Sequence, residues 1–155
     1  MNTLIIIAAK YLFVVPILIA GIYFLKEKSY RNKKTIMFVA ISLVATFAVG
    51  ILANHLFDNP RPFVVGNFTP LIPHAADNGF PSDHTLLLAA ISSILYPFSR
   101  KLGFISWALT LIVGFARIAA GVHHGVDIAG SIIIAIAVTA IVYMVLRRKA
   151  SGEEA

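Results

Sequence analysis

The sequence predicts an all-α, polytopic membrane helix bundle with about five transmembrane helices. Its composition supports this class, since 59% of the 155 residues are hydrophobic and only 13% are charged, as is typical of membrane proteins. Its pattern supports it too, because long apolar runs alternate with short polar segments and about 20 apolar residues span a bilayer as a helix. No internal repeat or low-complexity tract divides the chain, so we expect a single domain over residues 1–155.

The first apolar run predicts a helix over residues 4–25, although Lys10 and Pro16 interrupt it. A signal peptide would carry a basic segment before the apolar core and a small-residue cleavage site after it, and this run has neither. The polar loop 26–34 follows, with five basic residues and one acid. The next apolar run predicts a second helix over 35–57.

Residues 58–81 are the one long loop that the sequence predicts, because they are rich in proline, which is excluded from helix interiors. A third helix is expected over 82–98, with Ser82 as its N-cap and Pro97 in its last turn. Its 17 residues would be about 25 Å long, less than the ~30 Å hydrocarbon core. We therefore expect this helix to begin below the membrane surface, with its N-terminus facing a cavity.

Two further apolar runs predict a fourth helix over 102–122 and a fifth over 124–146. Ten of the thirteen Lys and Arg residues fall in the segments 26–34, 100–101 and 147–149, and basic loops of this kind stay in the cytoplasm. The chain should therefore lie among the lipids of a plasma membrane with its long loop on the extracytoplasmic side. The net charge of +6 belongs mainly to these segments, so we expect no nucleic acid partner.

Polar side chains gather in the middle of the chain. All five histidines lie between Asn54 and Asp127, and Arg61 and Arg117 lie there too. A charged group at mid-bilayer depth costs roughly 2.5–3.5 kcal/mol, so such groups need partners and a function. Two arginines and a helix N-terminus are suited to binding an anion, since guanidinium groups match phosphate oxygens and helix N-terminal amides add a positive dipole.

Histidines and an aspartate near these arginines provide acid–base chemistry. His123 and Asp127 are four residues apart, so they would be neighbours at the start of a helix. A carboxylate beside an imidazole fixes its tautomer and makes the free nitrogen a better base or nucleophile. His84, on a different helix, could then protonate a leaving oxygen. The remaining histidines can equally be interfacial residues: His55, His74 and His124.

At these residues the sequence resembles the type 2 phosphatidic acid phosphatase superfamily, whose signature has three parts. Lys-x6-Arg-Pro is matched by Asn54-x6-Arg61-Pro62, and Pro-Ser-Gly-His by Pro81-Ser82-Asp83-His84. Ser-Arg-x5-His-x3-Asp is matched by Ala116-Arg117-x5-His123-x3-Asp127. Asn54, Asp83 and the stretch 71–77 resemble the bacitracin-resistance branch, the undecaprenyl pyrophosphate phosphatases. Members of that branch usually carry an additional N-terminal segment with a sixth helix, which we do not expect here.

The resemblance implies a role for each matched residue. His123 would be the nucleophile that attacks the terminal phosphorus of a lipid diphosphate and forms a phosphohistidine. Asp127 would orient His123, and His84 would protonate the leaving lipid phosphate. Four further groups would hold the phosphoryl oxygens: Arg61, Arg117, Ser82 and the amides near Asp83. The resemblance implies no metal or other cofactor, and water would release inorganic phosphate.

Asn54 stands where the family has a lysine, which removes one positive charge from the expected site. We hypothesise that Lys10 supplies part of this charge, since it lies only about 9 Å below the expected start of the first helix. The alternative is that Lys10 is an interfacial anchor whose ammonium group reaches up to the membrane surface. Asp83, similarly, can be only a favourable charge in the first turn of a helix.

The predicted function is hydrolysis of an isoprenoid lipid diphosphate, undecaprenyl diphosphate, by an integral membrane phosphatase. One alternative is a lipid monophosphate phosphatase that acts on phosphatidic acid or phosphatidylglycerophosphate. A second is a small proton-coupled transporter in which His84 and His123 act as gates. A third is that Arg117 and Asp127 form only a structural ion pair within the membrane.

Overall fold

The computed structural model of the protein describes residues 2–30 and 32–152. Within these residues it is all helical apart from turns and loops, which confirms the predicted fold class. The elements, in chain order, are α1 (Asn2–Lys10), α2 (Val14–Lys26), η1 (Lys28–Tyr30), α3 (Lys33–Leu56), α4 (Pro62–Val65), α5 (Asp83–Leu95), α6 (Arg100–Ala119) and α7 (Gly125–Gly152).

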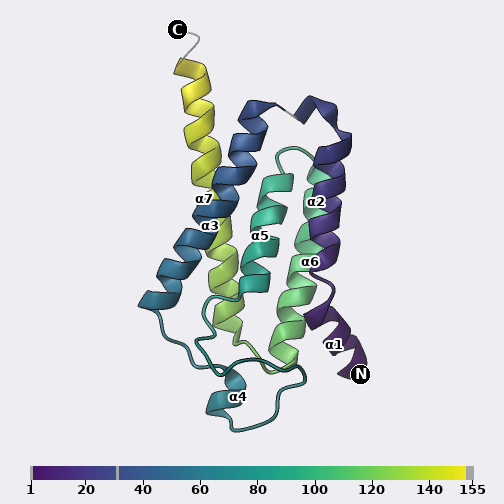
Figure 1. The fold of residues 1–155 in the computed structure, drawn as a ribbon, viewed down its shortest axis with the longest axis vertical. Helices are drawn as coiled ribbons and strands as arrows, with labels where there is room; N and C mark the ends of the chain where they lie inside the picture. The colour runs from purple at the N-terminus through teal and green to yellow at the C-terminus, as the bar shows by residue number, and fades with distance from the viewer. Residues whose placement is uncertain (1, 31, 153–155) are drawn as a thin grey trace.

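Helix α5 is the centre of the bundle and packs against α2, α3, α6 and α7 (Figure 1). Leu86 and Leu95 on this helix are almost completely buried. The hydroxyl of Ser92 lies 2.7 Å from that of Ser106 and 3.0 Å from that of Thr110, both on α6. In a lipid environment helices gain little from the hydrophobic effect when they associate, so these buried hydroxyl contacts help to fix α5 against α6.

Among the residues that the structure describes, four stretches are long and apolar enough to cross a membrane: 2–26, 33–56, 100–119 and 125–146. A fifth apolar helix, α5, is shorter than these four stretches, since its 13 residues form about 20 Å of helix. The sequence predicted a short third helix, but the expected bounds 82–98 were too long. The helix ends before Pro97, which has no N–H group to continue the helical hydrogen bonds.

The first predicted helix, 4–25, is two helices in the structure, separated by a turn at 11–13. Pro16 explains the position of this break. It has no N–H to donate to the carbonyl of Leu12, and a proline ring clashes with the carbonyl four residues earlier. Pro16 itself lies in the first turn of α2, where its missing N–H costs nothing.

The other predicted bounds differ from the structure by a few residues. The helices expected at 35–57 and 102–122 begin two residues earlier, after Asn32 and Ser99, whose side chains accept hydrogen bonds from backbone N–H groups three residues on. The helix expected from 124 begins at Gly125 and extends to Gly152. The long loop contains one helical turn, α4, with Pro62 at its first position, where proline is favoured.

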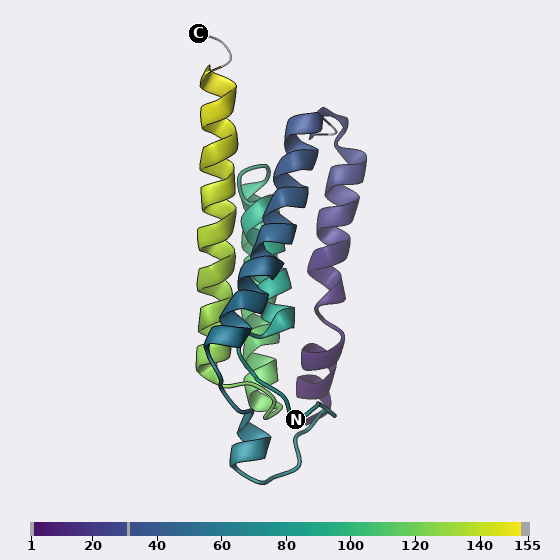
Figure 2. The same cartoon turned by 60° about the vertical axis from the view of Figure 1, so that its left-hand side comes forward.

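All the loops that carry the predicted site lie at one end of the bundle. The segment with α4, the N-terminal ends of α5 and α7 and the C-terminal end of α6 meet there, opposite the C-terminus (Figure 1). Figure 2 shows α1 beside this end, with the break before α2 just above it. The fold therefore brings residues from the start, middle and end of the chain to one place.

Candidate active site

His123 and Asp127 lie at the junction of α6 and α7. The chain leaves α6 through Gly121, whose φ of +78° is a left-handed conformation that glycine adopts without strain. His123 is 2% exposed and Asp127 fully buried, with 3.2 Å between Nδ1 of the imidazole and Oδ2 of the carboxylate. The sequence predicted this pair, but His123 precedes the helix rather than sharing its first turn.

Two guanidinium groups lie against the other imidazole nitrogen. Nε2 of His123 is 3.3 Å from Nη1 of Arg61 and 3.4 Å from Nη2 of Arg117. Arginine can only donate hydrogen bonds, so Nε2 must be the unprotonated acceptor and Nδ1 must carry the proton toward Asp127. This tautomer leaves the lone pair of Nε2 directed at the position where two cations converge.

Each arginine is buried and held by the backbone of another segment. Nη1 of Arg61 donates to the carbonyl of Val122 at 2.9 Å, and its Nε forms an ion pair with Asp77 at 2.7 Å. Nη1 of Arg117 donates to the carbonyl of Ala9 in α1 at 3.1 Å, while its Nε is buried with no hydrogen-bond partner among the described residues. Both arginines keep donor groups that an incoming oxyanion could use.

Two asparagines that sequence reasoning missed hold this arrangement together. Nδ2 of Asn59 donates to Oδ1 of Asp127 at 2.7 Å, so both carboxylate oxygens are engaged. Asn78 binds four backbone groups: its Oδ1 accepts from the N–H groups of Asn59 and Phe80, and its Nδ2 donates to the carbonyls of Asn54 and Phe57. No sequence pattern marked these two residues, because they act through loop geometry.

His84 and Ser82 lie at the start of α5. The ring of His84 contacts Phe13 edge-on, with 4.8 Å between ring centres, so the break between α1 and α2 forms a wall beside it. Ser82 occupies the predicted N-cap position, but its side chain makes no capping hydrogen bond. Instead its hydroxyl accepts from Thr85 at 3.2 Å, which leaves its own proton available to a ligand.

His74 joins the cluster from the long loop. Its ring centre is 6.0 Å from that of His123, and the two rings are nearly perpendicular. The sequence left open whether this histidine is only interfacial. The signal that could have found it is the stretch 71–77, which also supplies Asp77, the partner of Arg61.

Three predicted substrate-binding residues are not among the contacts around His123. The side-chain amide of Asn54 donates to the carbonyl of Phe80 at 2.7 Å, and together with Asp83 it lines a separate hollow of about 240 Å³ between α3 and α5. Lys10 is exposed at the end of α1, with its ammonium group 5.6 Å from the centre of the Tyr11 ring. Lys10 and Asn54 therefore remain predictions rather than observed parts of the cluster.

The electrostatic setting favours a neutral His123. Burial lowers the pKa of this imidazole below its ordinary value, and the positive charges of Arg117 and Arg61 lower it further, against the opposing hydrogen bond with Asp127. For Asp77, burial acts to raise the pKa, but the hydrogen bond and positive charge of Arg61 outweigh it, so the net shift is downward. At neutral pH His123 is then a free base and Asp77 an anion.

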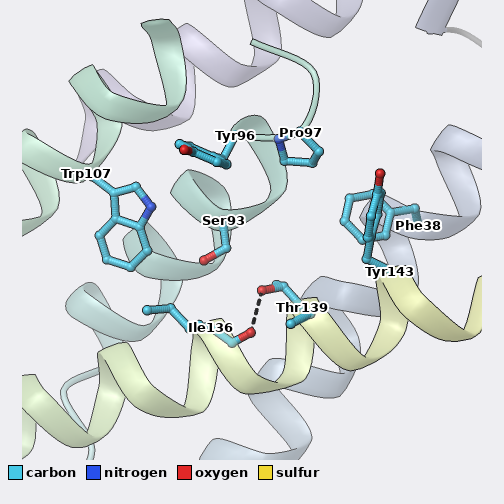
Figure 3. Close-up of a pocket in the computed structure, with 9 residues that line it drawn as sticks. Phe38, Ser93, Tyr96, Pro97, Trp107, Ile136, Thr139 and Tyr143 are labelled. Carbon is cyan, nitrogen blue, oxygen red and sulfur yellow. Dashed lines mark hydrogen bonds between the residues drawn. The ribbon is translucent and has the colours of Figure 1, made fainter. Parts of the chain in front are cut away.

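A cavity of about 500 Å³ adjoins the site on its loop side, and its lining includes His123, His124 and Phe68. Another, of about 370 Å³, lies further along the bundle toward the C-terminal end of α5. Figure 3 shows that its walls are mainly rings and aliphatic chains, such as Trp107 and Phe38. Its lining contains no histidine, arginine or acid, so it has no means to handle a phosphoryl group.

Comparisons with known proteins place the chain in a family. A family model described as the PAP2 superfamily matches residues 11–151. Undecaprenyl-diphosphatase BcrC of Bacillus subtilis (strain 168) is 39% identical over 106 residues, which cover 68% of this chain and 55% of that protein. The bacitracin transport permease protein BcrC of Bacillus licheniformis is 30% identical over 137 residues, covering 88% and 67%. The matches thus span between about half and two thirds of these relatives.

Two solved structures have a similar fold. The crystal structure of Aquifex aeolicus LpxE has a TM-score of 0.65 and 21% identity, covering 92% of this chain and 93% of that one. The first transmembrane PAP2 type phosphatidylglycerolphosphate phosphatase from Bacillus subtilis has a TM-score of 0.65 and 20% identity, covering 95% and 77%. At this identity the likeness concerns the fold alone.

Proposed function

Because the chain belongs to the PAP2 superfamily, we propose that it is a membrane lipid phosphatase that hydrolyses undecaprenyl diphosphate, an isoprenoid lipid, to the monophosphate and inorganic phosphate. One observation carries this proposal: Nε2 of a buried His123 faces two arginines while its Nδ1 is held by Asp127. A nucleophile with its lone pair directed at a doubly cationic position is suited to attack a phosphorus atom whose oxygens those cations bind.

The proposed first step is attack of His123 Nε2 on the terminal phosphorus. A nitrogen–phosphorus bond forms as the bond from that phosphorus to the bridging oxygen breaks, and the leaving lipid phosphate takes a proton from His84. Asp127 stabilises the positive charge that develops on the imidazole. Arg61 and Arg117 transfer their free donors to the phosphoryl oxygens, where charge accumulates in the transition state.

In the second step water attacks the phosphohistidine. The nitrogen–phosphorus bond breaks, inorganic phosphate leaves, and the proton that the water loses returns to His84, which is then ready for the next cycle. The hydroxyl of Ser82, which accepts from Thr85 and keeps its own proton, is placed in this proposal as a further donor to the phosphoryl group, and the amides near Asp83 at the start of α5 as others.

The choice of a diphosphate rests on the relatives. One is named an undecaprenyl-diphosphatase, and the stretches in which this sequence resembles the bacitracin-resistance branch include the loop that supplies His74 and Asp77. Another relative is named a transport permease, which favours the second candidate function, transport. Release of inorganic phosphate distinguishes the two functions, because only a phosphatase produces it.

A substrate panel tests the proposal. Purified protein in detergent should release phosphate from undecaprenyl diphosphate with a higher kcat/KM than from undecaprenyl monophosphate or phosphatidic acid. His123→Ala should abolish release, whereas His124→Ala should retain most of it, because the contribution of His124 to Asp127 comes from its backbone N–H. A preference for phosphatidic acid would replace the proposed substrate, and no release from any of the three would favour transport.

A further inference from the structure

The charged groups around His123 nearly cancel one another. Arg61 and Arg117 are positive, and Asp77 and Asp127 are negative, with Asp77 paired to Arg61 at 2.7 Å and Asp127 hydrogen-bonded to His123. With every imidazole neutral these four groups sum to zero. A phosphoryl group brings about two negative charges at neutral pH. The proton that His84 carries as the proposed acid would offset only one of them, so a site that binds this group in a largely buried place needs a further positive charge.

His74 is placed to supply that charge. Its ring lies edge-on to that of His123, with 6.0 Å between ring centres. The loop segment that carries it is anchored at both ends. On one side the N–H of Leu71 donates to the carbonyl of Ala120 at the end of α6, and on the other Asp77 forms an ion pair with Arg61. Its Nδ1 is buried without a well-formed hydrogen bond among the described residues, and only the backbone of Ala75 offers a weak one. This nitrogen can therefore form a stronger hydrogen bond than it has in the structure.

Burial and, after it, the positive charges nearby favour the neutral form of His74. Burial lowers its pKa first, and the positive charges of Arg61 and Arg117 lower it further; Ala75 opposes this shift, and His123 adds to it slightly. Asp77 is the acid whose charge interacts with His74. When a dianion binds between the arginines, its negative charge offsets theirs, and protonation of a nearby imidazole becomes favourable.

We propose that His74 is a phosphate-binding residue that takes up a proton from solvent when a phosphoryl dianion enters the site, and that it holds this proton through the reaction. The proposal rests on the proposed function, since it needs the arginines to bind a phosphoryl group. It separates two roles: His84 gives its proton to the leaving oxygen, while His74 retains its proton and supplies the charge that the four fixed groups lack.

Histidine NMR in detergent micelles tests this directly. Protein labelled with ¹³C at histidine is titrated with pH in the absence and presence of saturating sulfate, a tetrahedral dianion whose own charge does not change near neutral pH. The apparent pKa of His74 should rise by about one unit or more with sulfate bound. His55, which is exposed on the last turn of α3, is the matched control and should not move.

The outcomes distinguish this inference from the proposed function. If sulfate shifts the signals of His123 but leaves the pKa of His74 unchanged, His74 is not the proton acceptor and the inference is wrong, while the phosphoryl site stands. If sulfate shifts neither, the arginines do not form an anion site, and both proposals fail. The titration uses the wild-type protein, so it does not depend on a variant that folds.

A variant pair adds a kinetic readout. His74→Gln should raise KM for undecaprenyl diphosphate about tenfold or more and should remove the proton uptake that accompanies sulfate binding, while His55→Gln should change neither. A purely structural role for His74 would lower thermal stability and kcat without altering the number of protons taken up. That result would overturn the proposal.

Discussion

At the residue scale, the orientation of His123 depends on Asp127 and on the groups that bind Asp127 in turn. Asp127 fixes the imidazole, and Asn59 in turn fixes Asp127 through Oδ1 while the N–H of His124 binds Oδ2. A carboxylate with both oxygens engaged cannot rotate away from the imidazole. Partners of this kind orient a catalytic histidine and raise its basicity, much as they do for metal-bound histidines.

Asn59 can be tested by removing its amide. Asn59→Ala deletes one hydrogen bond to a buried carboxylate, which is worth about 1.5–3 kcal/mol and corresponds to a loss of about ten- to hundredfold in kcat/KM if it is expressed in the transition state. Asp58→Ala, at the neighbouring exposed position, is the matched control and should keep full activity. Equal kcat/KM values for Asn59→Ala and wild type would show that Asp127 needs no such support.

The sequence predicted the charged core of the candidate site but not its supports. The spacing from Arg117 through His123 to Asp127 follows a family signature, so these residues could be found from sequence alone. Asn59 and Asn78 could not, because their roles depend on the path of a loop rich in proline. Asn54 differs from these, since its position in the signature suggested substrate binding, whereas the contact that its amide makes in the structure is a hydrogen bond to the carbonyl of Phe80.

At the element scale, the first helix shows where sequence reasoning stops. Its apolar length predicted one continuous span, and Pro16 was recognised as an interruption. The length of the apolar run could not predict that residues on both sides of the turn would contact the candidate site. The carbonyl of Ala9 accepts from Arg117, and Phe13 contacts the ring of His84, so the interrupted helix becomes one wall of the site.

Lys10 lies directly before this break, at the end of α1. We predict that Lys10→Met lowers kcat/KM for undecaprenyl diphosphate about tenfold, or roughly 1.4 kcal/mol, because the flexible side chain next to Ala9 can leave the Tyr11 ring for a bound diphosphate. Unchanged kinetics would make Lys10 an interfacial anchor. Restoring the charge with Asn54→Lys is a poor control, since that change removes the hydrogen bond from Asn54 to Phe80.

The short central helix was predicted more successfully. Because α5 is about 20 Å long, it cannot reach across the ~30 Å hydrocarbon core. Its N-terminus lies toward the end of the bundle where α6 leads into α7 (Figure 1). The length of the apolar run and the position of Ser82 were enough to place this end. Its C-terminal bound was predicted three residues too late, at 98 rather than at Leu95, because a proline can lie either in the last turn of a helix or after it.

At the scale of the whole molecule, the chain is a multi-pass membrane protein of the PAP2 superfamily. The site lies at one end of the bundle, and the basic segment between α2 and α3 lies at the other (Figure 2). Basic segments of this kind remain cytoplasmic. We therefore propose that the site opens to the extracytoplasmic side of a plasma membrane, where it would meet a lipid diphosphate from the outer leaflet.

Cysteine labelling tests this orientation. The chain has no native cysteine, so single substitutions give a clean signal with an impermeant thiol reagent added to whole cells. Thr69→Cys, in the exposed part of the long loop, should be labelled, and Lys28→Cys, between α2 and α3, should be labelled only after the cells are opened. The reverse pattern would place the site on the cytoplasmic side.

In the proposed mechanism, His123 forms a covalent bond to phosphorus. The most direct measurement is a rapid-quench experiment with undecaprenyl diphosphate carrying a radioactive terminal phosphorus, in which protein is denatured in alkali, where phosphohistidine survives. The proposed mechanism predicts label on the wild type and on His124→Ala, its loss on brief acid treatment, and none on His123→Ala. Label retained by His123→Ala, or a wild-type protein that releases phosphate without ever carrying label, would contradict it.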